Sequence, residues 1–321
     1  MIFLQNYNNI IEQEINQLDL PIQPENLYGP IRYFLNIGGK RIRPILTFLA
    51  AEMFKAHEEE TKYAALAVEL FHNFTLIHDD IMDNAPLRRN QSTVHENWNT
   101  NIAILSGDVL FVKAYEILGK CNPNVLKDLF SVFSTTAREV CEGQQMDMDF
   151  ENRMDVNESE YIEMIRLKTS VLLGCALEMG AILGHANSEE RNAINQFGVH
   201  LGIAFQIQDD ILDLFGTPEK VGKQLGGDVI CNKKTLLSIT AKTRADAYDY
   251  NTLFELENEI NHDLKVRSIR KIYENLGVRE YCEFKMKEHY EKALDNLDKI
   301  PTKYPKDELK KIAHFLIARD Y

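Results

Sequence analysis

Phe205-Gln206-Ile207-Gln208-Asp209-Asp210-Ile211-Leu212-Asp213 is a stretch that places three carboxylates inside an apolar run. Asp209 and Asp213 stand four residues apart, so on a helix they share one face. Like charges this close together repel each other and resist burial, so a positive group must face them. Hard divalent cations such as Mg²⁺ prefer oxygen ligands of this kind.

The same pattern occurs earlier in the chain, at Ile77-His78-Asp79-Asp80-Ile81-Met82-Asp83. One Asp-Asp-x-x-Asp motif alone is equally well explained by a helix N-terminus or by a solvated acidic face. Two copies, each in apolar surroundings, argue against that explanation. We therefore expect two helices to contribute the two walls of one metal site.

Composition indicates an all-α protein. The 321 residues are 45% hydrophobic, with only 9 Pro and 16 Gly. There are few alternating runs of β-branched residues, which favours helices over strands. No linker long enough to divide the chain is visible, so we predict a single domain over residues 1–321.

Charge and cysteine usage limit the partners and the compartment. The 49 acidic residues outnumber the 36 basic ones, giving a formal net charge of −13, which does not suggest nucleic acid as the main partner. Five scattered cysteines without a C-x-x-C pair indicate reduced cytosolic thiols. The first residues lack the features of a signal peptide, and the apolar stretch 171–183 is too short to span a bilayer. We expect a cytoplasmic protein with no stable membrane insertion.

Two cationic motifs lie in the first third of the chain. In Gly38-Gly39-Lys40-Arg41-Ile42-Arg43-Pro44, three cations stand at an expected helix start, where they oppose the helix dipole. A bound anion would remove that conflict. Arg88 and Arg89 follow the first triplet and form either a salt-bridge cluster or a second anion clamp.

Further cations accompany the second triplet. Lys168 lies in an otherwise apolar helix predicted over 161–183, so it needs an acidic or phosphate partner. The glycine-rich stretch 216–228 is predicted to be a mobile lid that carries Lys223, with Lys233 shortly beyond it.

These groups predict a diphosphate that is held by metal at the mouth of an apolar pocket. The sequence contains no convincing nucleophile–base pair, no dinucleotide-binding fingerprint and no phosphate-binding loop motif. A metal-bound diphosphate is a good leaving group because its developing charge is stabilised in place. Apolar walls would keep water away from a reactive cation.

The chain resembles the trans-isoprenyl diphosphate synthases, the polyprenyl synthetase family, over nearly its whole length. The matching motifs, in order, are Gly38-Gly39-Lys40-x-x-Arg43-Pro44, His72, Asp79-Asp80-x-x-Asp83, Arg88-Arg89, Gly143-Gln144-x-x-Asp147, Lys168-Thr169, Phe205-Gln206, Asp209-Asp210-x-x-Asp213, Gly222-Lys223 and Asn232-Lys233. The resemblance implies an isoprenoid synthase fold, a bundle of long antiparallel helices around a central apolar cavity, and a homodimer.

The resemblance also implies roles for these residues. A cluster of Mg²⁺, expected to be three ions and replaceable by Mn²⁺, would be ligated by Asp79, Asp83 and Asp209 and supported by Asp80, Asp210 and Asp213. The allylic diphosphate would contact Arg88, Lys168, Lys223 and Lys233, with Thr169 and Gln206 at the reacting centre. Isopentenyl diphosphate would contact Lys40, Arg43, His72 and Arg89. Ionisation of the allylic carbon–oxygen bond, attack by the alkene and loss of a proton to the released diphosphate would then require no protein base.

Product length is expected to depend on the helix that precedes the first triplet. Thr75 lies nearly beneath Asp79, whereas Phe74 lies about 140° away at about 100° per residue. The family pattern nevertheless assigns chain length mainly to the position of Phe74. An aromatic residue followed by a small one resembles geranylgeranyl diphosphate synthases, so we predict that product, with farnesyl diphosphate as the alternative.

Three other interpretations are less well supported. A class I terpene cyclase would replace the second triplet with an Asn/Asp-x-x-Ser/Thr-x-x-x-Glu pattern, which the corresponding stretch lacks. A non-catalytic partner subunit would have lost a triplet or its cations, and none is missing. A helical scaffold with acidic faces does not explain two matched triplets. One departure from the family is that Asn90 and Ser92 replace its usual Gly and Pro, which predicts a local loop change.

Overall fold

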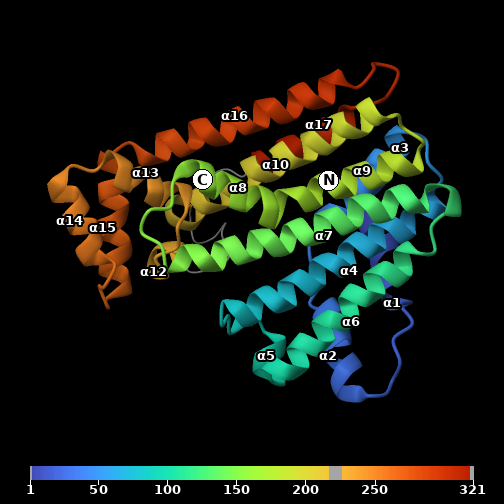
Figure 1. The fold of residues 1–321 in the computed structure, drawn as a ribbon, viewed down its shortest axis with the longest axis horizontal. Coiled ribbons are helices and arrows are strands. Elements are labelled where there is room, and N and C mark those ends of the chain that lie inside the picture. Colours follow the sequence, from blue (N-terminus) through green and yellow to red (C-terminus); the bar gives the residue numbers. More distant parts are fainter. Residues whose placement is uncertain (1, 217–225, 319–321) are drawn as a thin grey trace. The chain divides into compact units, whose positions relative to one another are not determined.

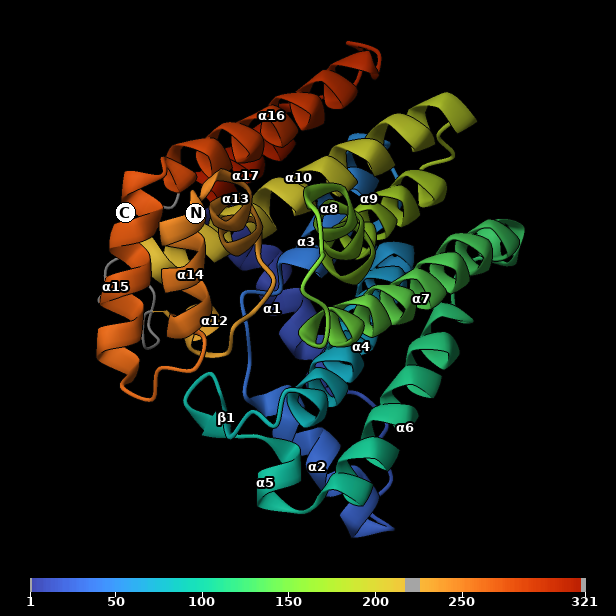
Figure 2. The same cartoon turned by 60° about the vertical axis from the view of Figure 1, so that its left-hand side comes forward.

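The computed structural model describes residues 2–216 and 226–318 and is almost entirely helical over them (Figures 1 and 2). The strands found in these ranges are β1 (Leu87–Arg88) and β2 (Gln91–Ser92), which form one antiparallel hairpin. The all-α prediction is therefore confirmed.

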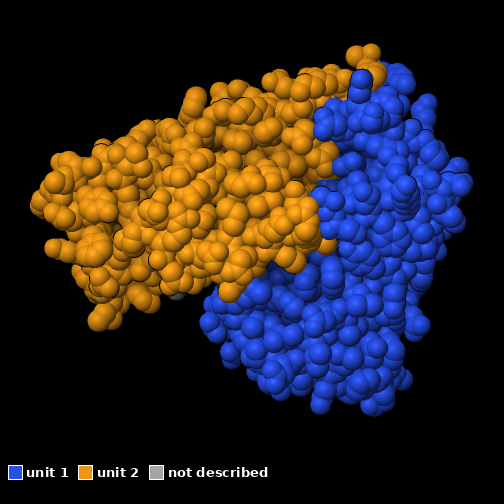
Figure 3. Space-filling view, viewed as in Figure 1, with its two compact units in different colours: residues 1–135, 175–194, 303–305 blue, residues 136–174, 195–302, 306–321 orange. Residues whose placement is uncertain are grey.

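The chain divides into two compact units, coloured separately in Figure 3. The first comprises residues 1–135, 175–194 and 303–305, and the second comprises residues 136–174, 195–302 and 306–321. The first aspartate triplet belongs to the first unit and the second triplet to the second unit. A single domain with a central cavity remains a prediction.

The first unit is built around α4, which packs against α3 and α6. Small residues make this close packing possible, since α4 buries the run Ala64-Ala65-Leu66-Ala67-Val68. Asn99 starts α6 by accepting a hydrogen bond from the Ile102 amide. The helices wholly in this unit are α1 (Ile2–Asn16), α2 (Glu25–Asn36), α3 (Ile42–Met53), α4 (Glu58–Met82), α5 (Val94–Asn97) and α6 (Thr100–Leu118).

Three helices run through both units: α7 (Pro123–Glu151), α9 (Val171–Leu183) and α10 (Ser188–Phe215). In the second unit, Ile203, Ile207 and Ile211 of α10 recur at helical spacing and form the centre of a buried apolar cluster. The remaining helices of that unit are α8 (Glu158–Ile165), α12 (Gly227–Ile230), α13 (Leu236–Arg244), α14 (Ala247–Leu256), α15 (His262–Asn275), α16 (Val278–Lys299) and α17 (Asp307–Ile317).

The structure corrects two local expectations. The helix predicted over 161–183 is not uniform, because Arg166–Ser170 forms a π-helical turn between α8 and α9. The sequence also predicts an interruption of the helices near Asp249-Tyr250-Asn251, but the structure places the break at Ala245-Asp246, and α14 passes through residues 249–251. Its start is fixed by Asp246, which accepts hydrogen bonds from the amides of Tyr248 and Asp249.

Most of the predicted lid, including Lys223, lies outside the described residues. None of the helices in residues 2–216 and 226–318 combines the length and apolar character needed to cross a bilayer.

Candidate functional site

Both aspartate triplets lie at the carboxyl ends of long helices. Asp83 is the C-terminal cap of α4, and Asp213 stands two residues before the end of α10. Neither helix has a basic residue in its last turn. Because a helix dipole is negative at this end, carboxylates there are unfavourable unless a cation compensates them. The helix N-terminus explanation of the motif is therefore excluded.

The middle carboxylate of each triplet is turned inward and hydrogen-bonded. Asp80 is 1% exposed and accepts from Arg88 Nε at 2.8 and 2.9 Å. Asp210 is also buried, and it accepts from the Tyr161 hydroxyl and from Gln206 Nε2, the latter at 3.0 Å. These carboxylates are engaged by protein donors, which suits a supporting role.

The carboxylates predicted as metal ligands are less buried than these inward ones, although Asp79 Oδ2 also accepts from Arg88 Nη2 at 3.3 Å. Asp79 and Asp209 are half-buried, and Asp83 is exposed. Asp79 and Asp83 are four residues apart on α4 and so project from one side of its end.

Burial raises the pKa of the supporting carboxyls. It raises the pKa of Asp80 to about 6, although Arg88 acts in the opposite direction. Burial and the nearby Asp228 raise the pKa of Asp210 to about 7 and that of Asp213 to about 6, with Lys233 opposing both shifts. A cation bound at either triplet would remove this penalty on the charged forms.

Three of the predicted ligands of isopentenyl diphosphate, Arg43, His72 and Arg89, come together in the first unit. Arg43 Nη1 lies 3.0 Å from His72 Nε2. Because a guanidinium can only donate, His72 Nε2 accepts this bond and the ring is neutral. Burial lowers the pKa of His72 well below its usual value, and the surrounding arginines, first Arg43 and then Arg89, lower it further. The result is a cationic cluster around a neutral imidazole.

Gly39 brings Arg89 into this cluster. A Cβ at Gly39 would lie 2.7 Å from Arg89 Nη1, so only glycine lets the guanidinium come this close. Arg89 and Asn90 both have positive φ and form the two-residue turn of the β1–β2 hairpin, in which Arg88 pairs with Gln91. Asn90 thus belongs to a tight turn that directs Arg88 to Asp80 and Arg89 to Gly39.

Arg41, which stands between Lys40 and Arg43 in the same motif, points into the protein. It is 3% exposed and makes ion pairs with Glu69 at 2.6 Å and Glu12 at 2.8 Å. It also donates to the Leu35 carbonyl at 3.0 Å. Its left-handed backbone, with φ of 49°, caps the start of α3. Arg41 therefore anchors the turn that carries Lys40 and Arg43.

In the second unit, Lys168 has the acidic partner that its position requires. Its Nζ lies 2.6 Å from Asp147 Oδ2, so the partner comes from the Gly143-Gln144-x-x-Asp147 motif. A Cβ at Gly143 would lie 2.2 Å from the Lys168 amide nitrogen, so glycine lets α7 contact the π-turn directly. Such turns often mark functional sites in helices.

A hydrogen-bonded chain links the π-turn to the second triplet. Thr169 Oγ1 donates to Gln206 Oε1 at 3.1 Å, and Gln206 in turn donates to Asp210. Predicted site residues from the π-turn and α10 are thereby connected.

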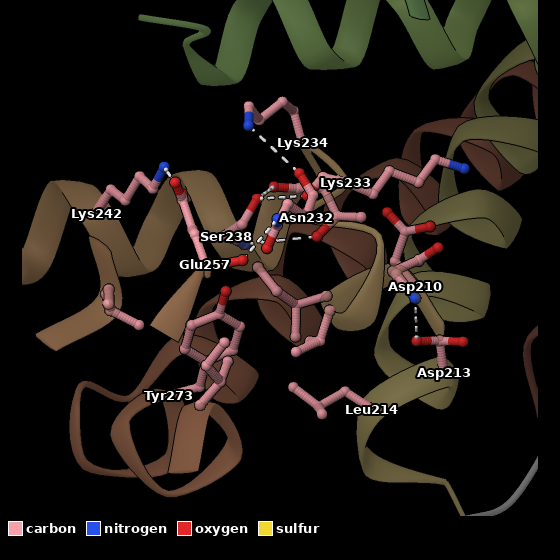
Figure 4. A pocket seen from close by; sticks show the side chains of 16 residues that line it. Asp210, Asp213, Leu214, Asn232, Lys233, Lys234, Ser238, Lys242, Glu257 and Tyr273 are labelled. Atoms are coloured by element: carbon pink, nitrogen blue, oxygen red, sulfur yellow. Dashed lines mark hydrogen bonds and ion pairs between the residues drawn. The ribbon is translucent and has the colours of Figure 1, made fainter. Parts of the chain in front are cut away.

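The segment after α10 is tied back to the triplet. Asp213 Oδ2 accepts from the Asp228 amide at 3.0 Å, and the Asp213 carbonyl accepts from the Gly226 amide at 2.7 Å. Figure 4 shows Lys233 extending toward Asp210, whereas its neighbour Lys234 extends in another direction. The structure thus brings Lys233, but not Lys234, to the second triplet.

Phe74, the main residue predicted to limit product length, lies in an aromatic cluster of the first unit. The ring of Phe74 contacts those of His78, Phe111 and Phe71, at centroid distances of 4.7, 5.0 and 5.5 Å. Phe133 contacts Phe71 in turn. Thr75 Oγ1 donates to the His72 carbonyl at 2.8 Å, a hydrogen bond within α4.

Sequence reasoning did not identify several residues that organise the site. Tyr161 and Asp228 contact the second triplet. Tyr161 offered no polar signal, because a tyrosine on an apolar helix face is usually a core residue. Glu69, in contrast, is predicted from the sequence to be structural, and its buried ion pair with Arg41 agrees with that prediction.

Within residues 2–216 and 226–318, no three acidic, histidine or cysteine side chains enclose a metal position. The donors available at the triplets are carboxylate oxygens at negative helix ends. Mg²⁺ is commonly held by one or two carboxylates together with substrate phosphates, so this donor set fits Mg²⁺. In such a site the substrate supplies part of the coordination.

Comparison with known proteins gives a consistent result. Residues 24–276 match the model of a family described as polyprenyl synthetase. The chain is 40% identical to a geranylgeranyl diphosphate synthase of Methanosarcina mazei, over 99% of this chain and 97% of that protein. It is similar to the structure of a geranylgeranyl pyrophosphate synthetase from Pyrococcus horikoshii, with a TM-score of 0.93, 33% identity, and coverage of 99% and 98%.

A further similar structure is that of a geranylgeranyl pyrophosphate synthase from Corynebacterium glutamicum complexed with isoprenyl diphosphate and magnesium. Its TM-score is 0.87 at 25% identity, and the match covers 99% of each chain.

Replacing Arg41 should destabilise the protein strongly. In Arg41→Met, Glu69 remains buried without its cation, a change that typically costs about 3–5 kcal/mol. Urea unfolding followed by circular dichroism measures this loss. The control is Arg32→Met, which removes an exposed pair with Glu25 and should cost under about 1 kcal/mol. Equal losses in the two variants would contradict the anchoring role of Arg41.

Mg²⁺ should raise the melting temperature more at about pH 8 than at about pH 5. The pKa values of Asp80, Asp210 and Asp213 are raised in the metal-free protein, so its folded state holds protons that the unfolded chain releases. Their contribution to stability is therefore present at low pH and is lost as pH rises through about 6 to 7. Bound Mg²⁺ would offset that loss only where the carboxylates are ionised.

Differential scanning fluorimetry with Mg²⁺ or with EDTA tests this prediction. The control is the double variant Asp79→Asn, Asp209→Asn, in which the Mg²⁺-dependent shift should disappear. A shift that does not depend on pH would contradict the assignment.

Proposed function

Because the chain belongs to the polyprenyl synthetase family and is a trans-isoprenyl diphosphate synthase, we propose that its product is geranylgeranyl diphosphate. The enzyme would condense isopentenyl diphosphate head-to-tail with dimethylallyl, geranyl or farnesyl diphosphate. The observation that carries this proposal is the combination of two aspartate-bearing helix ends with two separate sets of cationic side chains. Relatives at 38–40% identity that are named geranylgeranyl synthases support the product.

The two sets of cations suit two different diphosphates. Arg43 and Arg89 lie near neutral His72, and together with Lys40 they would bind isopentenyl diphosphate. Because His72 is neutral, it adds no charge and can orient Arg43 or a phosphate oxygen by hydrogen bonding. In the second unit, Lys168 and Lys233 would hold the allylic diphosphate, together with Arg88 of the first unit and with Lys223, which lies outside the described residues.

Asp79, Asp83 and Asp209 would hold Mg²⁺, proposed to be three ions per active site and replaceable by Mn²⁺. When bound, the ions would stabilise the negative charge that develops on the allylic diphosphate as it leaves. Asp80, Asp210 and Asp213 would support the ligands through the contacts described above. The Corynebacterium glutamicum structure with isoprenyl diphosphate and magnesium supports this assignment.

The chain's own residues would bind, orient and exclude water in this reaction. Thr169 and Gln206 would line the reacting centre, where their hydrogen bond fixes both side chains. No protein base is assigned, because the released diphosphate can accept the proton that the isopentenyl unit loses, next to its cationic carbon, after the new carbon–carbon bond has formed. The aromatic cluster at Phe74 would floor the pocket for the growing chain, with Thr75 beside it, and so stop elongation.

We propose further that the enzyme is a homodimer that associates through α6. Leu105 and Val112 of α6 are 57% and 55% exposed and lie seven residues apart on one helix face, together with Ile104. Exposed large apolar side chains gathered on one helix are typical of a surface that is covered by another protein chain. A cytoplasmic location agrees with the five cysteines, none of which forms a disulfide.

Incubation with isopentenyl diphosphate, Mg²⁺ and each allylic primer, followed by sizing of the dephosphorylated products, tests the proposed function. We expect geranylgeraniol as the main product. Farnesol would support the alternative product. Cyclic hydrocarbons would indicate a terpene cyclase, and absence of any product with every primer would indicate a non-catalytic partner subunit.

Shortening Phe74 should lengthen the product. Phe74→Ala removes a ring that contacts Phe71 and Phe111, so the chain can grow past this position. Chromatography of the dephosphorylated products should show one or more additional isoprene units. Phe284→Ala, at a 62% exposed position on α16, is the control and should leave the product unchanged. The same product from Phe74→Ala as from the parent protein would contradict the role of Phe74.

Placing a charge on α6 should separate the dimer. Val112→Glu would bury a carboxylate in the proposed interface, so light scattering after size exclusion should report a mass near 37.0 kDa instead of twice that value. Ile260→Glu, at a 90% exposed position, is the control and should remain dimeric. A parent protein that is itself monomeric would refute the homodimer.

A further inference from the structure

Lys265 is a buried lysine outside the motifs that define the site. It lies on α15 and is only 2% exposed to solvent. Lysine is almost never buried this deeply unless its ammonium group is fully hydrogen-bonded. A role in solubility or surface charge therefore does not explain why a lysine is buried at position 265.

The ammonium group of Lys265 can donate three hydrogen bonds, and three acceptors surround it. It donates to Asn232 Oδ1 at 2.8 Å, to the Glu257 carbonyl at 3.0 Å and to the Ile230 carbonyl at 3.2 Å. None of these acceptors is a carboxylate oxygen. The two carbonyls instead lie at the C-terminal ends of α12 and α14, where backbone carbonyls lack intrahelical partners and attract cations.

These contacts converge on the turn that precedes Lys233. Asn232 adopts a left-handed backbone conformation, with φ of 53°, which is uncommon for residues other than glycine and which asparagine tolerates better than most. Its side chain is held on both sides, since Oδ1 accepts from Lys265 and Nδ2 donates to the Glu257 carbonyl at 3.0 Å. Lys265 thus stabilises the conformation from which Lys233 leaves the turn.

The other end of this segment is tied to the second triplet through Asp213 and the amides of Gly226 and Asp228. The Lys233 amide also donates to the Asp228 carbonyl at 2.9 Å. The segment 226–233 is therefore fixed at one end by Asp213 and at the other by Lys265. In Figure 4, Asn232 lies at the branch where Lys233 extends toward Asp210 and Lys234 extends elsewhere.

From this geometry we infer that Lys265 is a positioning residue that locks the Asn232 turn and thereby aims Lys233 at the allylic diphosphate. The inference rests on the proposed function, because it assigns Lys233 to that substrate. Lys265 itself contacts no substrate atom in this scheme. Its effect on the reaction is transmitted through Asn232 and Lys233.

The first test compares substrates in Lys265→Met, which keeps the aliphatic stem and removes the ammonium group. A misplaced Lys233 should lower kcat/KM for the allylic diphosphate by about 10²-fold, the typical loss for a contact displaced by about 1 Å. The KM for isopentenyl diphosphate, whose proposed ligands are Arg43 and His72, should change less than about twofold. Lys271→Met, an exposed position on the same helix, is the control and should match the parent enzyme.

The second test is a double-mutant cycle with Lys233→Met. If Lys265 acts through Lys233, then removing it from the Lys233→Met enzyme should cause no further loss in kcat/KM for the allylic diphosphate. A residue with only a structural role would lower the activity of both backgrounds by the same factor. Additive losses, or equal losses for both substrates, would overturn the inference.

Circular dichroism and thermal unfolding verify that each variant is folded. If Lys265→Met does not fold, Lys265→Gln, which keeps two of the hydrogen-bond donors, replaces it in the cycle with the same expected non-additivity. Prenyl transfer by the parent enzyme in the same assay establishes the proposed function separately. A parent enzyme that elongates primers, combined with an additive cycle, would therefore reject only the role of Lys265.

Discussion

The placement of acidic side chains at the negative ends of two helices is the constraint on which the site depends. α4 and α10 both carry three aspartates near their carboxyl ends, and neither helix supplies a basic residue of its own there. Part of the compensation comes from elsewhere in the same unit, with Arg88 at Asp80 and Lys233 near Asp210. The negative charge that these cations do not compensate can attract a bound metal ion. The same helix ends that position the aspartates therefore also favour the binding of a cation.

In each unit, some charged side chains stabilise the protein through buried ion pairs or hydrogen bonds. Other charged side chains of the same motifs can bind a ligand. Arg41 and Arg43 stand two residues apart in one motif, yet Arg41 is paired with buried Glu69 and Arg43 contacts neutral His72. The division arises because Arg41 occupies the left-handed position before α3, which turns its side chain inward. Asp80 and Asp210 show the same division among carboxylates. A charged residue in a functional motif can thus serve the site entirely by fixing its neighbours.

The sequence was sufficient to predict the all-α class and most long helices, because apolar spacing and proline positions report helical periodicity directly. The partners of Lys168 and Asp210 could not be predicted, since Asp147 and Tyr161 become neighbours only through tertiary packing. The start of α14 was missed because one side chain, that of Asp246, outweighed the weak helix propensity of Asp249-Tyr250-Asn251. Lys265 was detectable in principle, since it precedes Ile269 and Tyr273 at four-residue intervals on the apolar face of α15.

The π-helical turn at Arg166–Ser170 has a consequence for comparing and engineering related chains. A turn that closes after one extra residue is equivalent to a single-residue insertion in a regular helix. A helical wheel drawn continuously from Tyr161 to Leu183 therefore assigns every residue beyond the turn to a face about 100° from its real one. Deleting one residue from this turn would restore a regular helix while rotating everything before it relative to α9. Designs that transplant Lys168 and Thr169 must consequently transfer the insertion together with the two side chains.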